Sequence, residues 1–255
     1  MARVFAVANQ KGGVAKTTTT QTLGVALARL GERVLLVDLD PQGCLTFSLG
    51  LDPDSLPISL HDVLVQKASA ADARIDVGDV SLLPTNIDLA GAEMHLLTRT
   101  GREYTLSRAL APIIADYDTV LIDCPPTLGV LTVNGLTAAN EVLIPLQCEA
   151  LSHRGVAQLL DSIADVREYT NRDLAVRGAI ATMFDARTRH AREVVDDVRS
   201  RFGISVLEPP VPKSVRFAEA PSRGLTILDH APGSPGAAAY SALAELLHAD
   251  SRLTS

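Results

Sequence analysis

Short runs of almost wholly apolar residues recur along this chain, and each is followed by a longer amphipathic stretch. The runs at 34–37 and 120–122 contain no polar residue. Strands of this kind are expected in a parallel sheet whose two faces are both covered by helices. The alternation therefore predicts an α/β fold with a doubly wound, mostly parallel β-sheet flanked by helices. The length of 255 residues suits a single domain, residues 1–255.

The apolar runs and the stretches between them predict the positions of the elements. We expect strands at 4–8, 33–38, 80–84, 119–123, 141–145, 177–183 and 204–207. Helices are expected at 16–30, 130–138, 155–170, 191–202 and 237–249, together with one long segment from about 89 to 116. Gly31 follows the first of these helices as a stop signal.

Composition excludes several classes of protein. Charged residues make up 21% and aromatic residues 4%, with no Trp, so the core must consist of Ala, Val, Leu and Ile. The net charge of −7 excludes a surface that binds polyanions everywhere, although a local basic patch remains open. The three cysteines form no CxxC pair, and no stretch reaches the about 18 apolar residues of a membrane span. We therefore expect a soluble, cytoplasmic protein with no membrane partner.

The segment Asn9–Thr18 carries the strongest functional signal, because it follows the first expected strand and opens the first expected helix. Glycines there let the backbone approach an anion, and the amides at a helix N-terminus point at phosphate groups. Lys16 would supply a charge for the β and γ phosphates, and the Thr17 hydroxyl suits Mg²⁺. The expected nucleotide-binding residues are Lys11, Gly12, Gly13, Val14, Ala15, Lys16, Thr17 and Thr18.

This loop departs from the strict GxxxxGK[ST] pattern, since Gln10 and Ala15 stand where that pattern has glycine. An ordinary Gly-Gly turn before a helix is the alternative interpretation. Lys-Thr-Thr at the helix start favours the phosphate loop. The chain also has only four lysines, and two of them, Lys11 and Lys16, lie in this segment.

Three aspartates stand at the ends of expected strands. Asp38 and Asp40 close the second run and Asp123 closes the fourth. Ligands of parallel sheets bind beyond the carboxyl ends of the strands, so these carboxylates belong at the same edge as the phosphate loop. Asp123 would hold Mg²⁺ directly or through water, and Asp38 would support the magnesium shell. A helix N-cap remains the alternative for each of them.

The segment 11–18 resembles the deviant Walker A motif of the ParA/Soj ATPases, a P-loop NTPase family within the wider group that includes MinD. The segments 34–43, 120–126 and 215–222 are similar to further motifs of that family, and the matches span about residues 3 to 248. The resemblance implies hydrolysis of ATP to ADP and phosphate, with Lys11, Lys16 and Asp40 as catalytic residues. It implies that Lys11 contacts the nucleotide of the other subunit in an ATP-sandwich homodimer, and that Asp40 positions the attacking water.

A basic region near the C-terminus is a candidate DNA interface. Residues 185–225 carry eight basic and six acidic side chains, whereas the other 214 residues carry 15 basic and 24 acidic ones. A solvated, salt-bridged helix face explains this balance equally well. The family resemblance implies that Arg187 and Arg216 contact the phosphates of non-specific double-stranded DNA, with Arg189, Lys213 and Arg223 as weaker candidates. Such binding depends steeply on salt.

The resemblance implies a role in chromosome or plasmid segregation. In that role the ATP dimer is associated with the nucleoid, and a ParB-like centromere-binding protein triggers hydrolysis. An orphan ParA-like ATPase that positions another cargo and a MinD-like membrane-associated positioning ATPase are alternatives, and a third is a P-loop enzyme acting on a small molecule. The stretch 248–255 has one Arg and no apolar anchor cluster, which disfavours the MinD-like membrane role. Residues Ala150–Arg154 depart from the usual family sequence, so their effect on regulation stays open.

Overall fold

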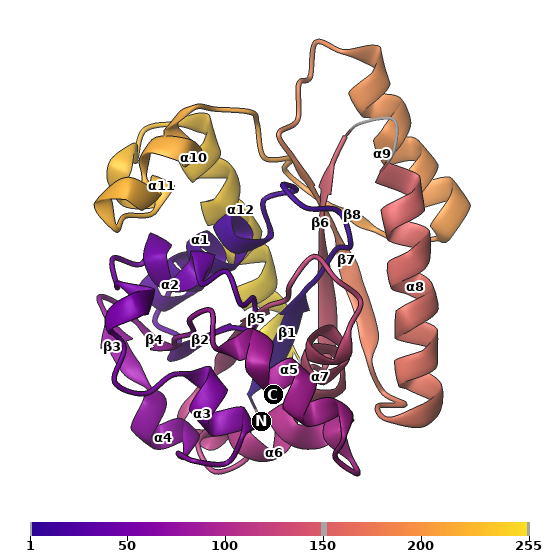
Figure 1. Ribbon diagram of the computed structural model, residues 1–255. Helices are drawn as coiled ribbons and strands as arrows, with labels where there is room; N and C mark the ends of the chain where they lie inside the picture. The colour runs from indigo at the N-terminus through magenta and orange to yellow at the C-terminus, as the bar shows by residue number, and fades with distance from the viewer. Residues whose placement is uncertain (1, 149–151, 254–255) are drawn as a thin grey trace.

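The computed structural model describes residues 2–148 and 152–253 of the chain (Figure 1). In these residues eight strands form one sheet in the order β3-β4-β2-β5-β1-β6-β7-β8. Neighbouring strands run parallel except β3 and β4, which form an antiparallel edge. The strands are β1 Arg3–Val7, β2 Val34–Asp38, β3 Ile75–Val77, β4 Val80–Leu83, β5 Thr119–Asp123, β6 Glu141–Gln147, β7 Ala175–Thr182 and β8 Val206–Leu207. The predicted fold class is confirmed.

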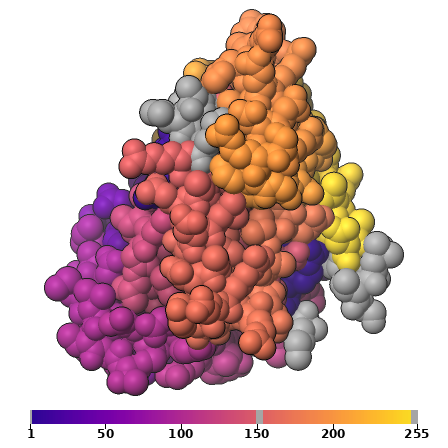
Figure 2. All heavy atoms as spheres, turned by 90° about the vertical axis from the view of Figure 1, so that its right-hand side faces the viewer, coloured from indigo at the N-terminus to yellow at the C-terminus, as the bar shows by residue number. Residues whose placement is uncertain are grey.

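Helices pack on both faces of this sheet, and the side chains of each strand alternate between two apolar clusters. One face is covered chiefly by α1 Lys16–Arg29, α2 Cys44–Ser48, α11 Ile227–His230 and α12 Pro235–Leu253. The other is covered by α3 Leu60–Leu64, α4 Ala70–Ala73, α5 Leu89–Leu97, α6 Thr105–Leu110, α7 Val130–Ala138, α8 Ser152–Tyr169 and α9 Arg189–Phe202. Figure 2 shows residues of α8 and α9 covering the side of the molecule that lies on the right in Figure 1.

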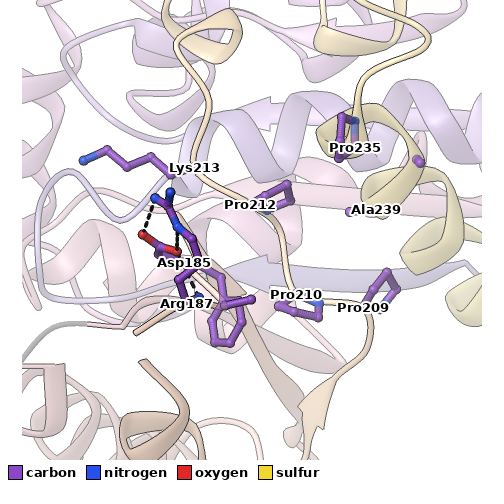
Figure 3. Close-up of a pocket in the computed structure, with 11 residues that line it drawn as sticks. Asp185, Arg187, Pro209, Pro210, Pro212, Lys213, Pro235 and Ala239 are labelled. Carbon is purple, nitrogen blue, oxygen red and sulfur yellow. Dashed lines mark hydrogen bonds and ion pairs between the residues drawn. The ribbon is translucent and has the colours of Figure 1, made fainter. Parts of the chain in front are cut away.

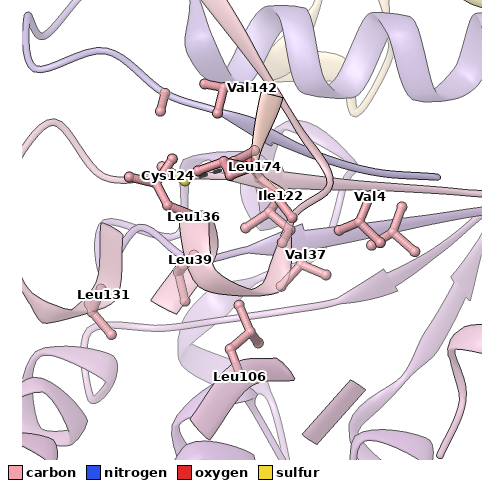
Figure 4. Close-up of a cluster of buried hydrophobic side chains, with 14 of the residues drawn as sticks. Val4, Val37, Leu39, Leu106, Ile122, Cys124, Leu131, Leu136, Val142 and Leu174 are labelled. Carbon is pink, nitrogen blue, oxygen red and sulfur yellow. Dashed lines mark hydrogen bonds between the residues drawn. The ribbon is translucent and has the colours of Figure 1, made fainter. Parts of the chain in front are cut away.

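The alternation explains why the strands read as unbroken apolar runs. In β5, Val120 and Ile122 face the α7 side, whereas Leu121 faces the α1 side, and all three are buried. In Figure 4, Val37 and Ile122, which lie on neighbouring strands, are close to helix residues of the apolar cluster on the α7 side of the sheet. A strand that is covered on both faces can place apolar side chains at every position.

The observed elements differ from the predicted ones in one long segment and at several short ones. The single helical segment predicted from about 89 to 116 is wrong, because α5 ends at Leu97, the 3₁₀ turn Arg102–Tyr104 follows Gly101, and α6 ends at Leu110. Gly101 has a left-handed φ of 66°, and Pro112 follows α6, so both interrupt the helix. The edge strand β3, the short helices α2, α3, α4 and α11, and α10 Arg216–Glu219 were not predicted. Among the described residues, no helix is both long and apolar enough to cross a bilayer.

The strand order places a binding crevice beside β1. From β1 the chain passes through α1 to β2 on one side, and from β5 it passes through α7 to β6 on the other. These two connections leave the sheet on opposite faces. In doubly wound sheets, such a reversal opens a crevice at the carboxyl ends of the strands. The segment 9–15 leaves β1 at this point.

Candidate active site

The loop between β1 and α1 has an open, left-handed backbone at its centre. Gly13 has φ 73° and Ala15 has φ 67°. A Cβ atom built on Gly12 or Gly13 would meet no atom within 4 Å, so this side of the loop is open. Ala15 stands at the N-cap of α1, and no side chain caps the helix there. The first amides of α1 are therefore available to an anion.

Two buried polar side chains anchor this loop to neighbouring strand ends. Asn9 Nδ2 donates a hydrogen bond to the carbonyl of Pro145 at 2.7 Å, and its Oδ1 accepts one from the Lys11 amide at 3.0 Å. Thr182 Oγ1, at the end of β7, donates to the carbonyl of Val14 at 3.0 Å. Sequence reasoning missed both anchors, although each is a polar residue at the end of an apolar strand.

The two lysines of the loop point to different places. Lys16 is 7% exposed, and its Nζ lies 3.5 Å from the Lys11 carbonyl, so its amino group stays within its own loop. Burial lowers the pKa of Lys16, and the nearby carboxylates of Asp123 and Asp40 oppose this effect. Lys11 Nζ lies 3.3 Å from Oε1 of Gln147, at the end of β6.

A hydroxyl and a carboxylate meet where a magnesium site was predicted. Thr17 Oγ1 donates to Asp123 Oδ2 at 2.6 Å, and Thr20 Oγ1 lies 3.5 Å from the other oxygen of that carboxylate. Burial raises the pKa of Asp123, and the nearby charge of Asp38 adds to this effect. These hard oxygen donors fit Mg²⁺, which takes few protein ligands and keeps several waters. Within the described residues no group of three or more His, Cys, Asp or Glu could hold a metal.

Asp38 ends the strand next to Asp123, and Asp40 lies in the turn that follows it. The register of β2 and β5 places Asp38 opposite Asp123. Asp38 Oδ2 accepts hydrogen bonds from the amide and hydroxyl of Thr46 at 2.8 and 2.7 Å, and burial raises its pKa to about 7. Asp38 thus holds the turn that carries Asp40. Asp40 is partly exposed and accepts a hydrogen bond from the Gln42 amide at 3.0 Å.

Two hollows contain predicted site residues. The first, of about 700 Å³, contains Arg187 and Lys213 at its rim, with Phe184 and several prolines in its wall (Figure 3). The Thr182–Val14 hydrogen bond joins the strand that leads into this groove to the phosphate loop. The second hollow, of about 480 Å³, contains Thr17 and Thr18 together with Phe47 and Ile87. The second hollow therefore adjoins the predicted phosphate site, whereas residues of other segments line the first.

The predicted DNA-binding side chains are all exposed, and three of them pair with a neighbouring acid. Arg187 is 90% exposed and lies 2.9 Å from Asp185, as Figure 3 shows, and Arg189 pairs with Glu193 at 2.7 Å. Arg216 lies 3.6 Å from Glu219. The structure brings Arg187 and Lys213 to one groove and places Arg189 at the start of α9. Arg216 and Arg223 lie on the segment that follows Lys213 and includes α10. Ion pairs this exposed contribute little to stability, so a phosphate group can replace the acid.

Residues Ala150–Arg154, which depart from the usual family sequence, are described only at the C-terminal end of this stretch. Residues 149–151 lie outside the described residues, whereas Arg154 is an exposed residue of α8.

Comparison with known sequences identifies relatives along nearly the whole chain. A family model described as an AAA domain matches residues 2–176. The sporulation initiation inhibitor protein Soj of Bacillus subtilis is 43% identical over 247 residues, which cover 96% of this chain and 98% of Soj. The chromosome partitioning protein ParA of Caulobacter vibrioides is 44% identical over 246 residues, covering 95% of this chain and 92% of that protein.

Solved structures share the fold and hold the expected ligands. A Mycobacterium smegmatis protein described as cobyrinic acid a,c-diamide synthase, with bound ADP and magnesium, has a TM-score of 0.87 and 54% identity. That match covers 97% of this chain and 94% of the other. The septum site-determining protein MinD of Pyrococcus horikoshii, complexed with Mg-ADP, has a TM-score of 0.77 and 27% identity, covering 97% and 96% of the two chains.

Proposed function

The chain belongs to the Soj and ParA family of P-loop ATPases, with ATP and Mg²⁺ as its ligands, and from this premise we propose that it is a DNA-partitioning ATPase. In this proposal ATP drives formation of a homodimer that binds DNA non-specifically at the nucleoid. A ParB-like centromere-binding protein triggers hydrolysis and release during chromosome or plasmid segregation. The observation that carries the proposal is the separation of the two lysines, since Lys16 stays in its own loop and Lys11 lies against Gln147.

The proposed chemistry is ATP + water → ADP + phosphate. The amides of α1 and the Lys16 amino group bind the phosphates, while Thr17 and Asp123 hold magnesium. When bound, magnesium neutralises charge on the β and γ phosphates. Asp40 orients the attacking water, and Asp38 keeps Asp40 in place through the turn that it shares with Thr46. The trans contact of Lys11 would complete the site only in the dimer.

The exposed arginines support the DNA-binding part of the proposal. Arg187 and Arg216 lie on segments that follow the carboxyl ends of the last strands, and their partners are exposed acids on the same segments. Contacts of this kind neutralise phosphates without reading bases, so affinity falls steeply with salt. Joining two chains doubles the number of cations along one duplex, which would make DNA binding depend on the nucleotide.

A second candidate function comes from the relative of 54% identity, which is described as a synthase of cobyrinic acid a,c-diamide. In that role ATP turnover would serve the amidation of a carboxylic acid substrate. The two functions differ in what stimulates hydrolysis. ATP turnover that rises with cobyrinic acid and an amide donor, and ignores DNA, would favour the synthase.

The decisive experiment is DNA retention with ATP, with ADP and without nucleotide, across a salt series. The wild-type chain is expected to bind DNA only with ATP, and the affinity is expected to fall as salt rises. Asp40→Ala should bind ATP, hydrolyse little and retain DNA longer, whereas Lys16→Ala should not bind DNA in any nucleotide state. Arg216→Glu should lose DNA but keep ATP. Equal DNA binding in all nucleotide states would contradict the proposed switch.

A further inference from the structure

A third hollow, of about 460 Å³, lies beside the helices α3, α4 and α6. Its lining comes from two segments, 63–71 and 99–112, and includes no residue of the phosphate loop or of the predicted magnesium site. Helix α3 packs against both α4 and α6, and the three helices lie together in the lower part of Figure 1. The hollow is therefore separate from the nucleotide site.

The lining of this hollow carries two positive charges and no negative one. Among the described residues that line it, Arg99 and Arg108 are the only charged ones. Arg33, for comparison, lies 2.8 Å from Asp118. No carboxylate pairs with Arg99 or Arg108 in the part of the chain that the structure describes. Two uncompensated cations in one concave site attract an anion.

Neutral groups hold both guanidinium groups in place. Arg99 Nη2 donates to Oε1 of Gln66 at 2.6 Å, and Gln66 has a left-handed backbone with φ 64°, which is uncommon for a residue with a side chain. A Cβ atom built on Gly101 would lie 3.3 Å from Arg108 Nη2, so that guanidinium lies against the Gly101 backbone. Arg108 Cζ also lies 5.8 Å from the centre of the Tyr104 ring. These contacts orient the two cations without neutralising them.

The rest of the wall is small and mostly apolar. Its apolar members are Val63, Ala68, Ala70, Ala71, Ala109 and Pro112. Ser69 Oγ already donates to Asp72 Oδ2 at 2.6 Å, and Thr105 Oγ1 donates to the Arg102 carbonyl at 3.0 Å. The charged donors that face a ligand are therefore the two arginines, and the alanines leave room for an apolar body.

We propose that this hollow binds a small phosphorylated compound, with its phosphate group on Arg99 and Arg108 and its apolar body against the alanines. A guanidinium group matches phosphate with two parallel N–H donors, and such charge-assisted bonds are about twice as strong as neutral ones. The volume lies within the range of about 300–1,000 Å³ that is usual for small-molecule sites. A nucleic acid would need a row of cations along its backbone, whereas this hollow offers two at one point. The inference goes beyond the proposed function, because it uses none of the residues assigned to ATP or DNA.

The test fills the phosphate loop with Mg·ADP and then titrates the chain with phenyl phosphate, while the arginine Nε–H signals are followed by NMR. We expect saturable shifts of the Arg99 and Arg108 signals. Arg99→Gln and Arg108→Gln should each weaken binding roughly tenfold or more, because each removes a charge-assisted contact. Arg201→Gln, which removes an exposed arginine in the last turn of α9, is the matched control and should bind like the wild type.

A second variant separates loss of the anion contact from loss of folding. Arg108→Lys keeps the charge without the planar fork, so it should retain more affinity than Arg108→Gln. Inorganic phosphate should bind more weakly than phenyl phosphate, because it lacks the apolar body.

Three results would overturn the inference. The first is equal affinity for phenyl phosphate in the wild type and both glutamine variants, and the second is equal shifts with phenol and with phenyl phosphate. The third is a response to a polyglutamate peptide but not to phenyl phosphate, which would assign the hollow to an acidic protein partner.

Discussion

Ala15 directly precedes Lys16 in the phosphate loop. It is a residue with a side chain whose backbone nevertheless adopts the left-handed conformation. Its φ of 67° and ψ of 34° match the conformation that the strict motif reserves for glycine. A Cβ atom in that conformation costs about 1–2 kcal/mol. The sequence showed that glycine was missing here, but only the structure shows that the backbone keeps the glycine conformation regardless.

Replacing Ala15 with glycine should therefore stabilise the nucleotide-free protein. The change removes the cost of the left-handed conformation. Glycine also gives the unfolded chain more freedom, which lowers stability by about 0.4–1 kcal/mol. We expect a net gain of about 0.5 kcal/mol, seen as a melting temperature about 1–2 °C higher in calorimetry. Ala26→Gly, in the middle of α1, is the control and should lower stability by about 1 kcal/mol. A lower melting temperature for Ala15→Gly would show that the strain is absent.

At the scale of elements, hydrogen bonds join the loop between strand β1 and helix α1 to strands β6 and β7. Asn9 joins the loop to the carbonyl of Pro145, and Thr182 joins it to β7. The Val14 carbonyl that Thr182 supports belongs to a residue that is only 1% exposed. An unsupported buried carbonyl costs about 1–3 kcal/mol.

Thr182→Val keeps the shape of the side chain and removes its donor. We expect the free energy of unfolding to fall by about 1–3 kcal/mol and the affinity for Mg·ATP to fall with it, because the loop loses an anchor. Thr22→Val is the matched control, since the Thr22 hydroxyl is buried without a hydrogen-bond partner in the described part of the chain. That variant should be as stable as the wild type or more stable. Equal nucleotide affinity in both variants would exclude Thr182 as an anchor.

Local pattern predicted the central strands and most of the longer helices, but it missed the short elements and the break in the segment from about 89 to 116. Strand β5 and helix α7 have the predicted bounds, because the first is an unbroken apolar run and the second is an apolar stretch that begins directly after Gly129. The predicted helix from about 89 to 116 ignored Gly101, where the chain turns. Strand β3 has three residues that are partly or fully exposed, and it exists through pairing with β4, which its own sequence does not indicate.

At the scale of the whole molecule, one rule predicted most of the candidate site. The carboxyl ends of parallel strands meet at one edge, so Asp38 and Asp123 were expected near the loop, and the register places them opposite each other. The strand order could not be read from the sequence, because it depends on contacts between distant segments. For the same reason the sequence did not reveal Thr182 as a partner of Val14, 168 residues away.

The most direct test of the account is a calorimetric titration of the chain with ATP and magnesium. We expect the wild type to take up one nucleotide per chain and Lys16→Ala to take up none, because Lys16 is the buried cation of the phosphate loop. No uptake by the wild type, or equal uptake by Lys16→Ala, would contradict the account.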